Sequence, residues 1–163
     1  RVLPLRNGEE FGQENVGVYL EWDYNKTDKA YPYYAVNVSS MASGNDSVNG
    51  SNGLFFFVSN NSDRINQVNF SIQVKTKSCV ITKPLNDFYI MAPLLKTELA
   101  KWNYLSDVRK NMPVERVLQF VQLPFATLKK MDPRFRPGEI EQVKFIFDKQ
   151  PAGDIIIDKI GYN

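Results

Sequence analysis

The side-chain chemistry available to this chain is limited by two residue counts. The sequence contains no histidine and a single cysteine, Cys79. Histidine is the commonest side-chain base and a frequent metal ligand, so Ser-His-Asp triads, Cys-His pairs and His-rich zinc sites are excluded within this chain. Paired acids remain at Glu9/Glu10 and Glu139/Glu141, and two acids suffice to hydrolyse a glycosidic bond. Nearness in sequence does not set the separation in space that hydrolysis needs, so we expect a domain that is not an enzyme.

Aromatic side chains form the second set able to contact a ligand, because several are bunched beside polar or basic residues. Strand alternation must direct one of Tyr33 and Tyr34 inward, and Trp22 has core packing as an alternative role. Trp102 is the strongest candidate, because a large exposed aromatic side chain in a polar, loop-like segment indicates a binding function. The alternative is that its ring packs this loop against the core. The ligand-binding candidates are Trp22, Tyr31, Tyr33, Tyr34, Lys101, Trp102, Tyr104 and Arg109.

The elements that must position these side chains are mostly strands. Apolar and polar residues alternate with a period of two over much of the chain, which is typical of half-buried strands. Residues 54–58 are apolar on both faces, which predicts a central strand. The candidate strands cover residues 16–24, 33–39, 54–58, 68–75, 78–83, 87–91, 117–124, 140–147 and 154–162.

The β pattern is interrupted over residues 84–115, which we interpret as a long excursion between strands. Within it, residues 92–102 could form one or two helical turns. A second short helix or turn is expected over residues 125–130, directly after Pro124. The sequence therefore predicts an all-β fold, a two-sheet antiparallel β-sandwich with one long loop or short-helix excursion.

Size and charge favour one domain that binds neither nucleic acid nor a membrane. The 163 residues fit a single domain over 1–163. The formal net charge is only +2, which provides no strong field to gather nucleic acid, and no apolar run approaches membrane-spanning length. Residues 1–70 carry a net charge of −3 and residues 71–163 a net charge of +5. Because the chain begins at Arg1 rather than methionine, we expect a mature form or a piece of a larger chain.

Three segments near the carboxyl end follow a recurrent order. Phe120-Val-Gln-Leu-Pro-Phe125 precedes Ile140-Glu-Gln-Val-Lys-Phe-Ile-Phe147, and Gly153-Asp-Ile-Ile-Ile-Asp158-Lys-Ile160-Gly-Tyr162 closes the chain. This order resembles the ending of jelly-roll carbohydrate-binding modules and related galactose-binding-domain-like β-sandwiches. The strands at 53–58 and 68–74 fit the middle of the same architecture. The resemblance covers roughly residues 50–75 and 116–162, and the excursion at 84–115 is longer than the pattern leads us to expect.

The resemblance also implies a structural calcium ion. In such sandwiches an acid of the last strand often faces a calcium shared with acids near the amino end, and the matching position here is Asp158. Its expected partners are Glu10, Glu21 and Asp23, with Glu9 as a further choice. Calcium takes six to eight oxygen ligands, so carboxylates from both chain ends would hold the sandwich closed. The alternative is that Asp158 makes a local cap or salt bridge.

The function implied by the resemblance is non-catalytic binding of a polysaccharide or oligosaccharide, by aromatic stacking and polar contacts. Such a module would be an accessory domain appended to a secreted, polysaccharide-active enzyme, which implies a secreted or cell-surface location. The basic residues around Trp102 make an anionic polysaccharide a further ligand class. The alternative function is a structural or protein-interaction β-sandwich without a sugar site.

Six Asn-x-Ser/Thr sequons occur, which in a secreted eukaryotic protein would carry glycans and otherwise are only asparagine-rich loops. Their asparagines are Asn25, Asn37, Asn45, Asn49, Asn60 and Asn69.

Overall fold

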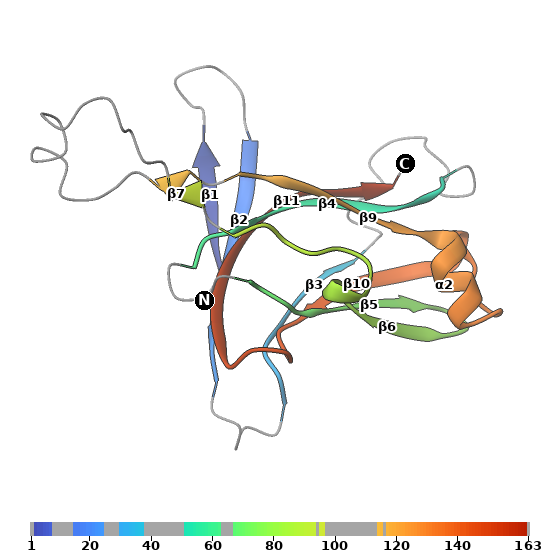
Figure 1. Ribbon diagram of the computed structural model, residues 1–163. Coiled ribbons are helices and arrows are strands. Elements are labelled where there is room, and N and C mark those ends of the chain that lie inside the picture. The colour runs from blue at the N-terminus through green and yellow to red at the C-terminus, as the bar shows by residue number, and fades with distance from the viewer. Residues whose placement is uncertain are drawn as a thin grey trace, which may run out of the picture.

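The computed structural model describes the backbone of residues 2–7, 15–24, 30–37, 51–62, 67–93, 95–96, 114–115 and 117–162. Side-chain surroundings are described for residues 17–24, 30–37, 51–62, 67–93 and 117–162. Most of these segments form two antiparallel sheets stacked as two layers (Figure 1).

The larger sheet has five strands in the order β1-β2-β11-β4-β9, and every neighbouring pair is antiparallel. The longest strand, β11, lies in its centre, between strands from the beginning and middle of the chain. The strands are β1 (Val2–Asn7), β2 (Asn15–Asp23), β4 (Gly53–Asn60), β9 (Gln119–Pro124) and β11 (Ala152–Tyr162).

The second sheet has four strands in the order β3-β10-β5-β6. They are β3 (Tyr33–Asn37), β5 (Ser71–Thr76), β6 (Val80–Pro84) and β10 (Ile140–Ile146). Successive strands along the chain often change sheet, as from β2 to β3, β4 to β5 and β9 to β10. Two four-stranded sheets connected in this way, with β1 added at one edge, form a jelly roll.

Short elements occupy the connections. The two-residue strands β7 (Leu95–Lys96) and β8 (Val114–Glu115) pair with each other. The helix α2 (Phe125–Met131) follows β9 directly and lies at one end of the sandwich, beside the ends of both sheets (Figure 1). Two 3-10 turns cover Leu85–Asp87 and Pro137–Glu139. No helix in the described part of the chain is long and apolar enough to cross a membrane.

The core lies between the two sheets because alternate residues of each strand point inward. On β4, Leu54, Phe56 and Val58 are fully buried. The ring of Phe56 contacts that of Phe145 on β10 edge to face, with centroids 5.2 Å apart, and so joins the layers. Burying a large aromatic or aliphatic side chain contributes about 1.5–3 kcal/mol, so this alternation supplies much of the stability of the sandwich.

The sequence predicted the sandwich, the central position of β4 and the short helix α2, and the structure confirms these. Residues 87–91 were expected to form a strand, but Asp87 ends a 3-10 turn and the four residues after it have no strand pairing. The helix expected over 92–102 is wrong at Leu95–Lys96, which form β7; most of its other residues lie outside the described part. The strand β1 was not predicted, because the Pro4 within it and the charges after it obscure the alternation.

Candidate functional site

Trp22 belongs to the core, which corrects its prediction as a ligand-binding residue. Its side chain points inward from β2 and is only 4% exposed. The indole stacks on the ring of Phe147, with centroids 4.2 Å apart and planes 13° apart. Its Nε1–H donates to the carbonyl oxygen of Gln150 at 3.0 Å. A ring covered in this way cannot stack on a sugar.

The two adjacent tyrosines of β3 point to opposite faces, as the alternation required. Tyr34 points inward and stacks on Phe145, with ring centroids 6.3 Å apart, and burial raises its pKa above the ordinary value. Tyr33 points outward and is 59% exposed. Tyr31 precedes it by two residues, is 54% exposed, and contacts the ring of Tyr24 edge to face at 5.5 Å. The structure therefore leaves Tyr31 and Tyr33 accessible to a ligand.

The outer side of the four-stranded sheet carries polar side chains beside Tyr33. Strand β10 lies next to β3, and its Lys144 places Nζ 4.4 Å from the centroid of the Tyr33 ring. A cation at this distance is attracted to the ring electrons and restrains the ring. Tyr33 stays more than half exposed, so much of its ring remains open to solvent. We call this surface the polar sheet face, and its members are Tyr33, Asn37, Gln73, Thr82, Gln142 and Lys144.

Hydrogen bonds between neighbouring strands hold the amide groups of the polar sheet face in place. Gln142 Nε2 donates to Asn37 Oδ1 at 2.9 Å, from β10 to β3. Gln73 Nε2 donates to Thr82 Oγ1 at 3.0 Å, from β5 to β6. Each amide has further hydrogen-bonding capacity beyond one such bond. Ordered amides on the same sheet face as an exposed aromatic ring can therefore meet the hydroxyl groups of a sugar.

Sequence reasoning did not select Asn37, Gln73, Gln142 or Lys144 as site residues. The alternation within residues 68–75 already marked one side of that strand as solvent-facing, and that is where Gln73 lies. The missing information was that β10 pairs with both β3 and β5, which brings these polar positions onto one sheet face with Tyr33.

The remaining predicted ligand-binding residues, Lys101, Trp102, Tyr104 and Arg109, lie outside the described residues. Their role stays a prediction.

The described acids predicted to share calcium are spread along the larger sheet. Glu21 lies opposite Asp154, and Asp23 lies opposite Ala152. Asp158 is four residues further along β11 than Asp154, which places it about 13 Å from the Glu21 position. Calcium–oxygen distances are about 2.3–2.6 Å, so Asp158 does not share one ion with Glu21 or Asp23. This corrects the predicted ligand set.

Within the described residues, no three Asp, Glu or Cys side chains gather as a metal site would require. Glu10, the fourth predicted ligand, lies outside the described residues, so calcium binding itself stays a prediction.

Two sequons contrast in their surroundings. Asn60 is 2% exposed, and its Oδ1 accepts the backbone N–H of Ser62 at 2.9 Å. A glycan on this side chain is incompatible with its buried position. Asn37 instead lies exposed on the polar sheet face.

Comparison with known proteins supports the fold. No protein-family model matches the sequence, and no curated protein matches it. Among solved structures, the family 30 carbohydrate-binding module of the cellulosomal cellulase Cel9D-Cel44B of Clostridium thermocellum matches with a TM-score of 0.58 and 9% identity. The match covers 99% of this chain and 81% of that one. This chain has the fold of a carbohydrate-binding module. The predicted resemblance to such β-sandwiches is thereby confirmed at the level of the fold.

Proposed function

We propose that this protein is a non-catalytic carbohydrate-binding module that holds a polysaccharide or oligosaccharide on the polar sheet face. The observation that carries the proposal is the exposed ring of Tyr33, which is contacted by Lys144 and shares one sheet face with the hydrogen-bonded amides of Asn37 and Gln142. The shared fold with a cellulosomal module supports the same ligand class.

The physical basis is the two-sided character of a sugar ring. Its C–H faces are apolar and gain from contact with an aromatic plane, while its hydroxyl groups need hydrogen-bonding partners. Tyr33 supplies the plane, and Tyr31, two residues before it, supplies a second exposed ring. Lys144, opposite Ala35, and Gln73, opposite Lys144, supply hydrogen-bonding groups, and Gln142 supplies more further along the same face, opposite Asn37. The polar sheet face can thus contact both parts of a sugar.

A module of this kind acts by tethering. Attachment to a polysaccharide raises the local concentration of whatever domain the module is joined to, without forming any new catalytic contact. We therefore propose a secreted or cell-surface location and a polysaccharide-active enzyme as the joined domain. The neighbour's origin in a cellulosomal cellulase supports this choice.

The proposal is tested by affinity electrophoresis and isothermal titration calorimetry against cellulose, xyloglucan, xylan, mannan and mixed-linkage glucan oligosaccharides. We expect at least one of these glycans to bind, and Tyr33→Ala to weaken that binding about tenfold, as expected for the loss of about 1.4 kcal/mol. Ile90→Ala is the matched control, because Ile90 is an exposed apolar residue outside both sheets. A folded protein that binds no glycan, or a Tyr33→Ala variant that binds like the wild type, contradicts the proposal.

A protein-interaction role is the second candidate, favoured by an aromatic cluster on the outer side of the larger sheet. Phe55, Phe57 and Phe120 contact one another, with centroid distances of 6.4, 5.7 and 5.4 Å. Phe120 is among the exposed large hydrophobic residues. If this cluster binds another domain, Phe120→Asn should abolish association in analytical ultracentrifugation while glycan binding stays unchanged.

A further inference from the structure

A cavity of about 560 Å³ lies at the α2 end of the sandwich, apart from the polar sheet face. Its size falls within the range of small-ligand sites. It is formed by the end of α2 and the segment that leads into β10. We call it the α2 pocket, and its lining residues are Lys129, Pro133, Phe135, Arg136, Pro137, Gly138 and Glu139.

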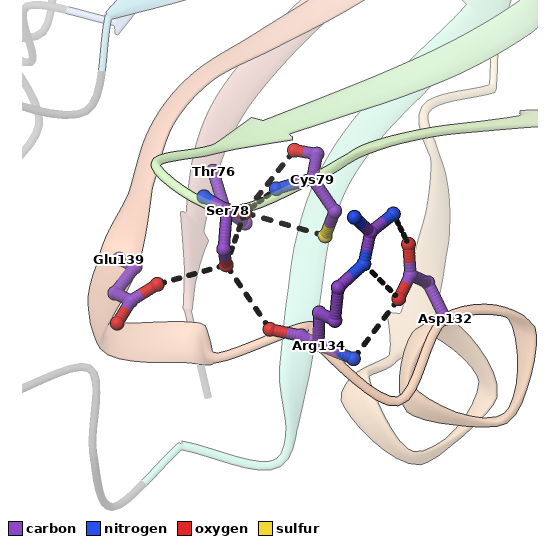
Figure 2. A network of polar contacts seen from close by, with 6 residues as sticks. All are labelled: Thr76, Ser78, Cys79, Asp132, Arg134 and Glu139. Carbon is purple, nitrogen blue, oxygen red and sulfur yellow. Dashed lines mark hydrogen bonds and ion pairs between the residues drawn. The ribbon is translucent and has the colours of Figure 1, made fainter.

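The wall of the α2 pocket is tied to the tip of the β5–β6 hairpin. Ser78 Oγ lies 2.9 Å from Glu139 Oε2 and 3.1 Å from the carbonyl oxygen of Arg134 (Figure 2). The backbone N–H of Lys77 also donates to the carbonyl oxygen of Glu139 at 3.1 Å. The hairpin tip is itself fixed, because Thr76 Oγ1 accepts the N–H of Cys79 at 2.9 Å. The Glu139 carboxylate therefore has a defined position before any ligand arrives.

Arg134 forms an ion pair with the neighbouring Asp132, which neutralises its charge. Arg134 donates through Nε and Nη2 to the two carboxylate oxygens of Asp132, at 3.1 and 2.8 Å (Figure 2). These hydrogen bonds lower the pKa of Asp132 and raise that of Arg134, so both stay ionised. Because this pair neutralises itself, the charge that faces the α2 pocket comes from its lining residues.

Those lining residues carry two cations and one anion. Lys129 and Arg136 are basic, and Glu139 is the only acid among them. Arg136 Nε lies 3.9 Å from Glu139 Oε1, which is longer than a hydrogen bond, and the Arg136 side chain is 76% exposed. An exposed guanidinium that is not hydrogen-bonded to Glu139 can rotate and bind a carboxylate or sulfate through two parallel hydrogen bonds. Glu139 remains as an acceptor for a hydroxyl group.

We propose that the α2 pocket binds a sugar that bears an anionic group, either the carboxylate of a uronate or a sulfate ester. Arg136 pairs with the anionic group, Lys129 adds a second positive charge, and Glu139 accepts a hydroxyl of the same sugar. Pro133 and Pro137 contribute apolar surface against the ring. The saccharide nature of this ligand rests on the proposed function, whereas the anion preference rests on the pocket's own charges.

The test titrates the protein with three probes and follows the backbone amide of Gly138 by NMR. The probes are digalacturonate, galactose 6-sulfate and uncharged galactobiose. We expect one of the two anionic probes to shift the Gly138 signal and galactobiose to leave it in place. Raising the NaCl concentration from about 0.02 to about 0.2 M should lower the affinity for the anionic probe, since salt screens exposed charges.

The variants separate the pocket cations from general surface charge. Arg136→Gln should lower the affinity for the anionic probe roughly tenfold, which is the loss expected for a charge-assisted hydrogen-bonded pair. Lys129→Gln should weaken it about threefold, in the range of an exposed ion pair. Lys130→Gln is the matched control, because Lys130 occupies the same helical turn without lining the pocket, and it should stay within about twofold of wild type.

The outcomes of the two proposals are distinguishable. Anionic binding that survives Tyr33→Ala but not Arg136→Gln supports a second site in the α2 pocket, even if no neutral glycan binds anywhere. If a neutral glycan binds but neither anionic probe shifts the Gly138 signal, the proposed site in the α2 pocket is contradicted. The proposed function is then unaffected. Equal loss in Arg136→Gln and Lys130→Gln also contradicts the site in the α2 pocket, because surface charge alone would then explain the affinity.

Discussion

Lys144 and Tyr33 form a cation–π contact across two neighbouring strands, with Nζ 4.4 Å from the ring centroid. The residues are far apart in the sequence and meet because β10 pairs with β3, with Lys144 opposite Ala35 and Ile146 opposite Tyr33. The contact restrains the exposed tyrosine ring before a ligand binds, and less side-chain freedom then remains to be lost on binding.

Lys144→Met tests whether this restraint matters for glycan binding. Methionine keeps an unbranched apolar stem, one atom shorter than that of lysine, but removes the charge, so the cation–π contact is lost. We expect glycan affinity to fall about three- to tenfold while stability changes by about 0.5–1 kcal/mol. Titration calorimetry and urea denaturation measure the two effects. Lys75→Met is the control, since Lys75 lies on the same sheet but pairs with Glu141 at 3.1 Å. Equal effects of both variants would contradict a specific role for Lys144.

Gly153 is required by the packing of Trp22. A Cβ built on Gly153 would overlap the six-membered ring of the indole, lying only 2.8 Å from Cη2. The ring cannot retreat, because its stacking partner Phe147 lies 4.2 Å away. Gly153→Ala should therefore destabilise the protein by about 1–3 kcal/mol in chemical denaturation.

Gly17→Ala is the control for this variant. A Cβ at Gly17 meets the Cγ2 methyl group of Ile156 at 3.3 Å and the carbonyl oxygen of Ile157 at an ordinary contact distance of 3.7 Å, so a change of less than about 1 kcal/mol is expected. If the two alanine variants were equally stable, Trp22 would not be rigidly packed against β11.

Stability should decline at alkaline pH because two tyrosines resist ionisation in the folded state. Burial raises the pKa of Tyr162 to about 12, and burial together with the nearby Asp154 carboxylate raises the pKa of Tyr19 to about 12. The ordinary value is 10.0, so the unfolded chain loses these protons first. The stabilisation is fully present below pH 10 and is lost as the pH rises towards about 12.

Tyr162→Phe should make this decline shallower when the urea midpoint is followed over the same pH window. The Tyr162 hydroxyl is buried without a hydrogen-bond partner among the described residues, so its removal should not destabilise the protein at neutral pH. An alkaline slope identical to that of the wild type would contradict the pKa assignment.

The predicted calcium ion is tested with chelator-treated protein. If Asp158 holds calcium with Glu10, added calcium should raise the melting temperature of the wild type but not of Asp158→Asn. Glu21→Gln is the control, because Glu21 lies opposite Asp154 and too far along the sheet to share an ion with Asp158. A melting temperature unaffected by chelator, with no metal bound to the purified protein, would contradict the prediction.

Local alternation was enough to predict most strands and the sandwich that they form. In 68–75, apolar side chains on every second residue require a second layer to cover them, whatever the order of the strands. The same alternation required Tyr33 and Tyr34 to face opposite ways. The absence of histidine limited the chemistry independently of the fold.

Only the tertiary structure decided which side chains meet. The sequence could not show which of Tyr33 and Tyr34 points outward, that Trp22 is buried against Phe147, or that Asp158 lies away from Glu21. These outcomes depend on strand order and register between segments distant in the chain, and a shift of one residue would exchange the two faces of a strand. Periodicity depends on neighbours along the chain, whereas Lys144 reaches Tyr33 only because β3 and β10 are adjacent in the folded sheet.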